Sequence, residues 1–296
     1  MFKRLALSAD LFIRESIRSL LNNFDPPLVI LLYHRVCNVP DDPFQLAVSP
    51  EHFLDHLRYL KENWHVVRLE DAFQQRKEPA VAITFDDGYT DNLVYALPIL
   101  EACGVPATFF ITTGYLDTDE RYWWDELSMY GKAADMEYHG FLKAMQPEER
   151  NRHLAEIRWR HNSSVTYPEM NRSMTSLQLQ QLAASALVDI GSHGVSHTPF
   201  SILSAKTQLN EFKDSRDHLM QLLERDISAF SYPFGGVEDI ADSSSQLCRS
   251  AGYSYAVVNI PGQVHRWTNR YHLPRNIVRD WPLPVFAEMM QRFLTA

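Results

Sequence analysis

Short apolar runs alternate along most of the chain with longer segments whose apolar residues recur at helical spacing. Runs of the first kind are typical of strands buried on both faces, and segments of the second kind predict helices. Their alternation predicts parallel strands joined by crossover helices, and so an α/β fold that is either a barrel or a doubly wound sheet. We expect strands at 28–34, 81–85, 107–112, 186–193, 227–235, 253–258 and 272–278, and helices at 49–63, 90–104, 204–224 and 244–252.

Residues 115–185 interrupt this alternation. The stretch is polar and helix-prone, so we expect a helical insertion between two core strands that caps one face of the fold. No internal repeat, low-complexity tract or linker rich in glycine and serine divides the remainder. The pattern therefore favours one domain over residues 28–296.

Residues 1–27 predict an amphipathic helix, because apolar residues recur there at helical spacing among basic residues and Pro26 and Pro27 end the pattern. Such a helix can lie on an anionic membrane face, pack on its own domain or pack on a second subunit. Charged residues interrupt the apolar core that a secretory signal requires. We therefore expect a cytoplasmic protein, with peripheral contact at the inner membrane face as one of the three roles open to this helix.

Charge and cysteine usage narrow the function classes. The formal net charge is −9 and the isoelectric point is near 5.7, which argues against a nucleic-acid partner. The three cysteines lie far apart and form no CxxC motif, so no disulfide framework is expected. No apolar run approaches the roughly eighteen residues of a membrane span. These properties give no indication of oligomeric state.

Polar residues follow several of the predicted strands directly. His34 follows the first strand, Asp86 and Asp87 follow the second, and His193 ends a later one. The carboxyl ends of parallel strands meet at one edge, where α/β folds gather their reactive groups. Two adjacent buried carboxylates repel each other and are costly to desolvate, so a cation beside them is the simplest way to tolerate both.

The segment GSHGVSH places His193 and His197 four residues apart, which we expect to bring both imidazoles to one side of a helical turn. Alone, this spacing is more typical of ordinary histidines than of a metal site. A strand-end carboxylate together with two such histidines is a common set of ligands for zinc or a neighbouring transition metal. The second aspartate would then be available as a base.

Three motifs, TFDDGY at 84–89, SHGVSH at 192–197 and YPFG at 232–235, occur in an order that resembles the NodB-like polysaccharide deacetylases, the fourth carbohydrate esterase family. LLYHRV and the helix beginning SPEHF resemble the opening of many members, and the resemblance covers about residues 28–280. It implies a distorted (β/α) barrel with fewer than eight strands. The implied reaction is metal-dependent removal of an N-acetyl group from an amino sugar.

Matched residue by residue, the resemblance implies that Asp87, His193 and His197 hold a divalent metal, most often Zn²⁺, with Co²⁺, Ni²⁺ or Mn²⁺ as alternatives. It implies that Asp86 is the general base for the attacking water. Pro233 and Phe234 match the third motif, in which the backbone N–H of the aromatic residue helps to hold the oxyanion.

The sequence departs from the family pattern in two places. The third motif usually carries an arginine a few residues before its proline, and here the nearest is Arg225, so Arg275 is our candidate for that charge. The alternative for Arg275 is an exposed ion pair of little consequence. The last motif usually supplies a histidine as general acid, and no clear match exists, so His34, His265 and His272 are all candidates.

Aromatic residues near the motifs are candidates for sugar contact. Tyr89 follows the paired aspartates, and Trp124 lies in the insertion beside Trp123. Aromatic faces stack on sugar rings, although tryptophans of this kind also anchor an insertion to its domain. We expect Tyr89, Trp124 and Pro233 to contact the substrate.

The expected partner is an acetylated amino-sugar glycan in the form of a polysaccharide, an oligosaccharide or a lipid-linked precursor. The alternatives are a deformylase or another amidohydrolase of non-peptide C–N bonds on the same barrel, and a non-catalytic carbohydrate-binding protein. The presence of Asp86 and the three expected ligands argues against the last of these.

Overall fold

The computed structural model describes residues 22, 24–39, 42–129, 136–161 and 172–295. The amphipathic helix expected at 1–27 falls almost wholly outside these residues and stays a prediction. The strands are β1 Leu28–Tyr33, β2 Arg35–Val36, β3 Ala47–Val48, β4 His65–Val66, β5 Ala80–Phe85, β6 Ala107–Ile111, β7 Val188–Ser192, β8 Ala229–Ser231, β9 Tyr255–Val257 and β10 Asn276–Ile277.

The helices are α2 Pro50–Asn63, α3 Leu97–Cys103, α4 Trp123–Met129, α5 Met136–Lys143, α6 Pro147–His161, α7 Ser176–Ala183, α8 Ala205–Leu223, α9 Ser244–Ser250 and α10 Leu283–Thr295. A π-helix, η2 Asn92–Ala96, leads into α3, and the short 3₁₀ turns are η1 Leu69–Phe73, η3 Thr113–Tyr115, η5 Phe200–Ile202 and η6 Val237–Asp239. In the described part of the chain, no helix combines the length and the apolar character needed to cross a membrane.

The main sheet has the strand order β10-β1-β5-β6-β7-β8-β9, and every pair along it is parallel. Its two edges approach each other through one segment, because Leu273 bridges Val257 of β9 while Asn276 and Ile277 pair with β1. The predicted distorted (β/α) barrel is confirmed. β1 and β5 are buried along their whole length, which is why they read as uninterrupted apolar runs.

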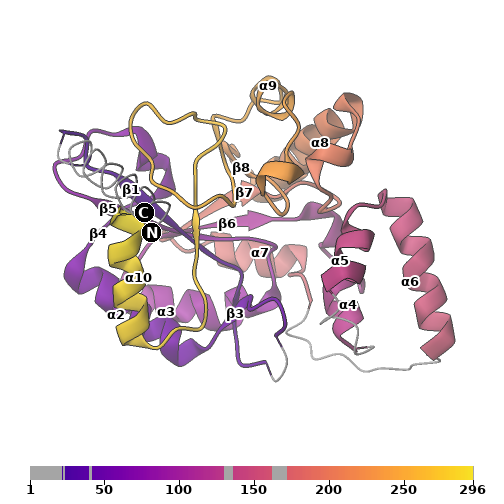
Figure 1. The fold of residues 1–296 in the computed structure, drawn as a ribbon, viewed down its shortest axis with the longest axis horizontal. Helices are drawn as coiled ribbons and strands as arrows, with labels where there is room; N and C mark the ends of the chain where they lie inside the picture. The colour runs from indigo at the N-terminus through magenta and orange to yellow at the C-terminus, as the bar shows by residue number, and fades with distance from the viewer. Residues whose placement is uncertain (1–21, 23, 40–41, 130–135, 162–171, 296) are drawn as a thin grey trace, which may run out of the picture.

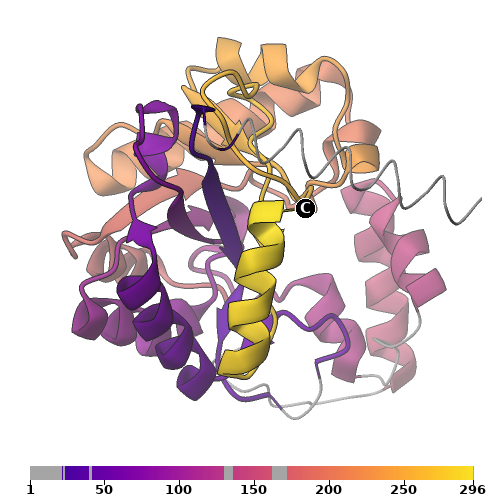
Figure 2. The same cartoon turned by 60° about the vertical axis from the view of Figure 1, so that its left-hand side comes forward.

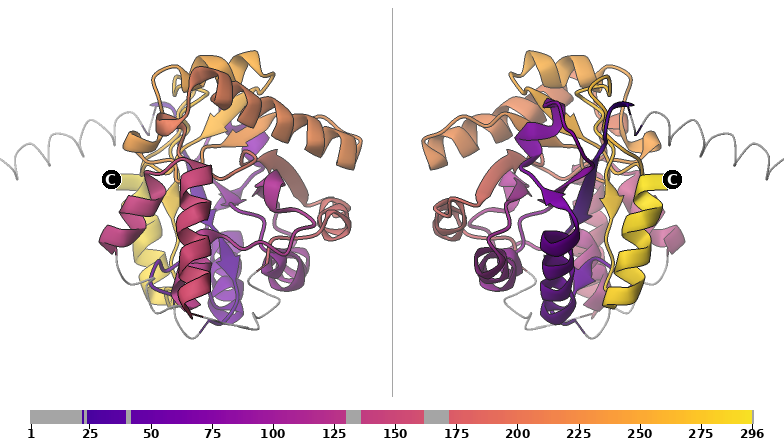
Figure 3. Two further views of the ribbon diagram at one scale, coloured as in Figure 1. Left: turned by 90° about the vertical axis from the view of Figure 1, so that its right-hand side faces the viewer. Right: turned by 90° about the vertical axis from the view of Figure 1, so that its left-hand side faces the viewer.

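Helices cover the outer face of the sheet (Figures 1 and 3). In the series α10, α2, α3, α7, α8 and α9, neighbouring helices pack side by side, with η2 linking α3 to α7 and α10 lying beside α2 (Figure 2). Ser49 caps α2 by accepting a hydrogen bond from the His52 N–H. Alternate residues of the strands, such as Val29 and Leu31 of β1, form the core beneath these helices.

The insertion is shorter than the sequence predicted. Helices α4, α5 and α6 stand together at one end of the sheet in Figure 1 and have an apolar cluster of their own around Trp123 and Trp124. Helix α7, although it lies within 115–185, belongs to the outer layer because Leu179 and Leu182 are buried in the main core. The insertion therefore ends before the Thr175 cap of α7.

The barrel interior is narrow, and its packing yields a stability prediction. Phe110 fills it opposite Gly191, where an added Cβ would lie 2.5 Å from the Phe110 ring. We expect Gly191→Ala to lower the free energy of unfolding by about 1–3 kcal/mol. Gly140 of α5 is the matched control, since nothing lies within 4 Å of an added Cβ there, and Gly140→Ala should be neutral or stabilising. Urea unfolding of both variants tests this, and equal stabilities would refute the packing argument.

Candidate active site

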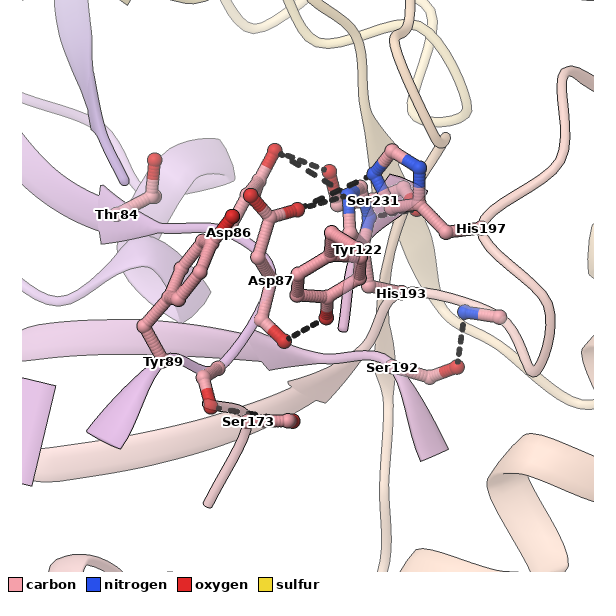
Figure 4. A network of polar contacts seen from close by, with 12 residues as sticks. Thr84, Asp86, Asp87, Tyr89, Tyr122, Ser173, Ser192, His193, His197 and Ser231 are labelled. Carbon is pink, nitrogen blue, oxygen red and sulfur yellow. Dashed lines mark hydrogen bonds and ion pairs between the residues drawn. The ribbon is translucent and has the colours of Figure 1, made fainter. Parts of the chain in front are cut away.

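Asp86 and Asp87 follow β5 in a turn that breaks the strand geometry. Asp87 and Gly88 have φ of +74° and +82°, in the left-handed region that a β-strand does not use. The Tyr122 hydroxyl donates a hydrogen bond of 2.7 Å to the Asp87 carbonyl oxygen, and the Asp86 N–H donates to the Tyr33 carbonyl at 3.1 Å. The turn directs both carboxylates toward the residues that follow β7 (Figure 4).

Asp87, His193 and His197 converge there as a buried cluster whose ligand atoms all lie within 4.8 Å of one another. Asp87 Oδ1 lies 3.1 Å from His197 Nε2 and 3.5 Å from His193 Nε2. His193 Nδ1 lies 2.8 Å from the Ser231 carbonyl oxygen, so this nitrogen carries the proton and leaves Nε2 with its lone pair toward Asp87 (Figure 4).

The two histidines do not lie on a helical turn, so that prediction is wrong. His193 follows β7 directly, and Gly194 and His197 have φ of +78° and +50° in the loop that follows. Glu211 of α8 organises this loop, because its carboxylate accepts hydrogen bonds from the N–H groups of Val195 and Ser196 at 2.6 and 3.0 Å.

The cluster suits a divalent metal ion. Asp87 Oδ1 is buried and makes no hydrogen bond of acceptable geometry, and such an atom is costly to bury unless a cation or donor meets it. Burial opposes the charged form of Asp87, but the interaction with the nearby His193 and His197 rings holds its pKa below the ordinary value. One carboxylate and two imidazoles with free Nε2 atoms are a set that zinc and its neighbours accept.

Asp86 is paired most closely with Arg275, and its Oδ2 also lies 3.8 Å from His193 Nε2 of the cluster. The guanidinium is fully buried and meets the carboxylate through two hydrogen bonds, of 2.8 Å to Oδ1 and 2.6 Å to Oδ2. Ser231 Oγ donates to Asp86 Oδ2 at 3.1 Å and accepts a bond from Arg275 at 2.9 Å. Burial alone would raise the pKa of Asp86, but the charge and hydrogen bonds of Arg275, together with His193 and His34, outweigh burial, so the pKa is lowered and the group is ionised at neutral pH.

These groups face one cavity of about 210 Å³ at the carboxyl ends of the strands. Its polar wall carries Asp86 and the three residues of the cluster. Its apolar wall comes from the insertion, the β2–β3 loop and β10. The lining residues are His34, Phe44, Leu46, Asp86, Asp87, Trp124, His139, His193, His197, Phe234, Asn259, Ile277 and Arg279.

Several residues singled out in the sequence line this cavity. His34 does so at the end of β1, where burial lowers its pKa although Asp87 and Asp86 act in the opposite sense. Phe234 has φ of +61° and stands 4.7 Å, ring to ring, from His197. Trp124 lies equally close to His197 on another side. The roles predicted for these residues remain predictions.

Two residues expected to contact the substrate, Tyr89 and Pro233, and one candidate for the general acid, His272, do not line the cavity. Tyr89 is fully buried. Its hydroxyl is satisfied inside the protein, where it donates to Asp125 at 2.7 Å and accepts from Trp124 Nε1 at 3.0 Å. Pro233 is buried, and its carbonyl accepts the Gly235 N–H. His272 lies near Ser245 and Asn269, outside the cavity lining.

His265, the remaining candidate for a general acid, is also away from the cavity. Its ring stacks on Trp267 at 4.9 Å, and Nδ1 bonds to the Asp25 carbonyl. Among the three histidines proposed for that role, His34 is therefore the one that the cavity lining includes.

Several residues of the site carried no signal in the sequence. His139 and Phe44 belong to segments without a recognisable motif, and Ser231 and Arg279 are ordinary residues of their strand ends. The one available hint was that Arg275 and Arg279 flank the same short strand, β10.

Comparison with known proteins gives a consistent result. The model of the polysaccharide deacetylase family matches residues 73–256, more than half of the chain. YxkH of Bacillus subtilis (strain 168), a candidate polysaccharide deacetylase, is 24 % identical over 255 residues, which cover 84 % of this chain and 70 % of that protein.

Solved structures share the fold. The Streptococcus pyogenes deacetylase PplD in complex with acetate superposes with a TM-score of 0.64 at 20 % identity and covers 90 % of this chain and 98 % of that one. IcaB from Ammonifex degensii gives 0.63 at 18 % identity, with coverage of 92 % and 98 %. At such identities the likeness establishes the fold alone.

Proposed function

Because the chain belongs to the polysaccharide deacetylase family, we propose that it hydrolyses the N-acetyl group of an amino sugar in a glycan, releasing acetate and a free amine. One observation carries this proposal. A metal-ligand cluster of Asp87, His193 and His197 shares one cavity with Asp86, a carboxylate that a buried arginine keeps ionised. Amide hydrolysis needs an electrophilic centre and a base within one site, and this pairing provides for both.

Asp87, His193 and His197 would hold the metal ion, with Zn²⁺ first and Co²⁺, Ni²⁺ or Mn²⁺ as alternatives. When bound, such an ion acts as a Lewis acid toward the water and the carbonyl oxygen. The Ser231 carbonyl supports this assignment, because it fixes the tautomer of His193 in which Nε2 is free to bind.

Asp86 would accept the proton of the attacking water. The arginine pair and Ser231 orient its carboxylate and keep it ionised. The attack forms a C–O bond and turns the amide carbonyl into an oxyanion. The backbone N–H of Phe234, whose left-handed conformation sets its direction, would donate to that oxygen. The C–N bond then breaks, and the proton that Asp86 took from the water would go to the leaving amine, with His34, a neutral imidazole that lines the cavity, as the residue that would relay it.

The metal assignment predicts a stoichiometry. Purified protein should contain about one divalent ion per chain, and His193→Ala should contain much less, because two of three protein ligands hold an ion far more weakly. Elemental analysis of both proteins gives the answer. His139→Ala is the matched control, since this histidine lines the same cavity outside the cluster and its loss should leave the metal content unchanged. Unchanged metal in His193→Ala would refute the assignment.

The reaction itself is tested by quantifying the acid released from a panel of amides. The zinc-loaded protein should release acetate, with an equal amount of amine, from N-acetylated amino sugars. It should act weakly on the formylated sugars and on cyclic amides of similar size. A preference for formamides or cyclic amides would assign the chain a different hydrolase activity on the same barrel, and binding of sugars without any release would identify a carbohydrate-binding protein.

A further inference from the structure

The rim of the catalytic cavity is closed by contacts between segments far apart in the sequence. Arg279, after β10, donates hydrogen bonds to the carbonyl oxygens of Phe44 and Gln45 at 2.7 and 2.6 Å. The Phe44 ring in turn stands 4.6 Å from His139 of α5. The β2–β3 loop is thereby attached to the barrel on one side and to the insertion on the other.

Helix α5 continues the rim toward the other side of the cavity. Lys143 Nζ lies 4.6 Å above the Phe234 ring and 2.6 Å from an oxygen of Asp239 in η6. Asp239 is buried, so this ion pair is shielded better than one on an open surface. We call the set Arg279, Phe44, His139, Lys143 and Phe234 the collar.

Backbone hydrogen bonds connect the Phe234 segment to the Arg279 segment along the remaining side of the cavity rim. Asn259, which lines the cavity, donates its N–H to the carbonyl of Gly235 at 2.8 Å. The next residue, Ile260, accepts the N–H of Arg275 at 3.1 Å, and the chain then runs through β10 to Arg279. The collar therefore surrounds the cavity through an unbroken series of contacts.

The enclosed space is small. At about 210 Å³ it is below the roughly 300–1,000 Å³ of pockets that enclose a drug-sized ligand. This is room for about one sugar ring with its acetamido group. Phe44, Leu46, Ile277 and Trp124 supply apolar surface around that space, which suits a ring face and a methyl group.

A sugar inside a polymer has a neighbour on each side and needs two exits from the site, whereas a sugar at a chain end needs one. We propose that the collar makes the site a cup that accepts a free or terminal N-acetylated amino sugar and excludes internal residues of a polysaccharide. This inference rests on the proposed deacetylation, and it adds which unit of the glycan chain is attacked. An internal residue could enter only by breaking the Phe44–His139 contact or the Lys143–Asp239 pair.

The test uses zinc-loaded protein and β-linked N-acetylglucosamine oligomers of one to five units, isotopically labelled at the reducing end. Tandem mass spectrometry locates each unit that has lost its acetyl group. We expect one acetyl group to be lost per chain, from one terminal unit, whatever the length. Products deacetylated at internal units as readily as at the end would overturn the inference while supporting the deacetylase function. No acetate from any oligomer or from the monosaccharide would overturn both.

A second arm tests whether the collar causes the restriction. Phe44→Ala combined with Lys143→Ala removes both contacts, and the ratio of internal to terminal products should rise at least about tenfold. Phe141→Ala is the matched control, because Phe141 lies on the same helix α5 with 53 % of its surface exposed and is not part of the collar. Its product ratio should equal that of the original protein.

Circular dichroism verifies that the opened variant is folded. A folded double variant with an unchanged product ratio would contradict the collar as the cause of terminal attack. Should the double variant fail to fold, Phe44→Ala alone is measured in the same way, and the products of the unaltered protein still decide whether attack is terminal.

Discussion

Replacing Asp86 by asparagine is expected to lower turnover at least about a hundredfold, since proton transfer by a positioned base typically contributes a hundred- to ten-thousand-fold in rate. Asparagine keeps the shape of the side chain and an oxygen that can accept from Arg275, but it has no basicity. Arg275 loses its counter-charge in this variant, so stability should fall, but the variant should still fold, keep its metal and bind substrate, and the loss of activity should fall on kcat rather than on KM. Steady-state kinetics on an acetamido sugar, with elemental analysis of the same preparation, measures this.

Asp87→Asn is the matched comparison, because it makes the same chemical change one residue along. The two carboxylates are expected to differ in role, as Asp86 pairs with Arg275 and Asp87 meets the two histidines. Asp87→Asn should therefore lose metal, whereas Asp86→Asn should not. If Asp86→Asn lost its metal, the two aspartates would have exchanged roles. Near-normal turnover in Asp86→Asn would refute the mechanism.

Replacing Arg275 by methionine is expected to cost about 3–5 kcal/mol of unfolding free energy, the usual effect of leaving one member of a buried ion pair without its partner. Arg275 is fully buried, and besides Asp86 its guanidinium bonds to Val258 and Ser231. The free Asp86 carboxylate would also lose what keeps its pKa low, so turnover at neutral pH should fall. Urea unfolding measures the first effect and a pH–rate profile the second.

Combining Arg275→Met with Asp86→Asn gives the control for this prediction. With the carboxylate charge removed as well, the double variant should recover much of the stability lost in Arg275→Met, because no uncompensated charge stays buried. Equal losses in Arg275→Met and in the double variant would show that Arg275 acts by filling space and not through its charge. An exposed ion pair, the other role considered for this arginine, would give less than about 1 kcal/mol.

The elements of the fold were largely predictable, because parallel strands buried on both faces leave continuous apolar runs. The polar residues directly after those runs, His34, Asp86, Asp87 and His193, were found for the same reason, since strand ends converge in this topology. The family match over 73–256 contains neither His34 nor Arg275. His34 and Arg275 come close to Asp86 only through the order of the strands. β1, which His34 follows, lies in the sheet between β5, which Asp86 follows, and β10, which Arg275 precedes.

The failed predictions share a cause, which is that a distant segment decides where a side chain or a loop goes. Tyr89 was expected at the substrate, but Trp124 bonds to its hydroxyl and the Arg35 guanidinium stands 4.4 Å above its ring. The helical turn expected at His193–His197 is replaced by a loop in which Gly194 and His197 have left-handed backbone conformations and Glu211 of α8 accepts the N–H groups of Val195 and Ser196. The collar likewise joins segments that sequence spacing does not relate.

A crystal structure of the zinc-loaded protein with acetate bound would test the central claim most directly. We predict one ion at about 2.0–2.2 Å from an oxygen of Asp87 and from Nε2 of His193 and His197. We predict acetate in the same cavity, with Asp86 still paired to Arg275 and making no contact with the ion. An ion bound through Asp86 instead of Asp87, or acetate bound outside the cavity, would contradict the account.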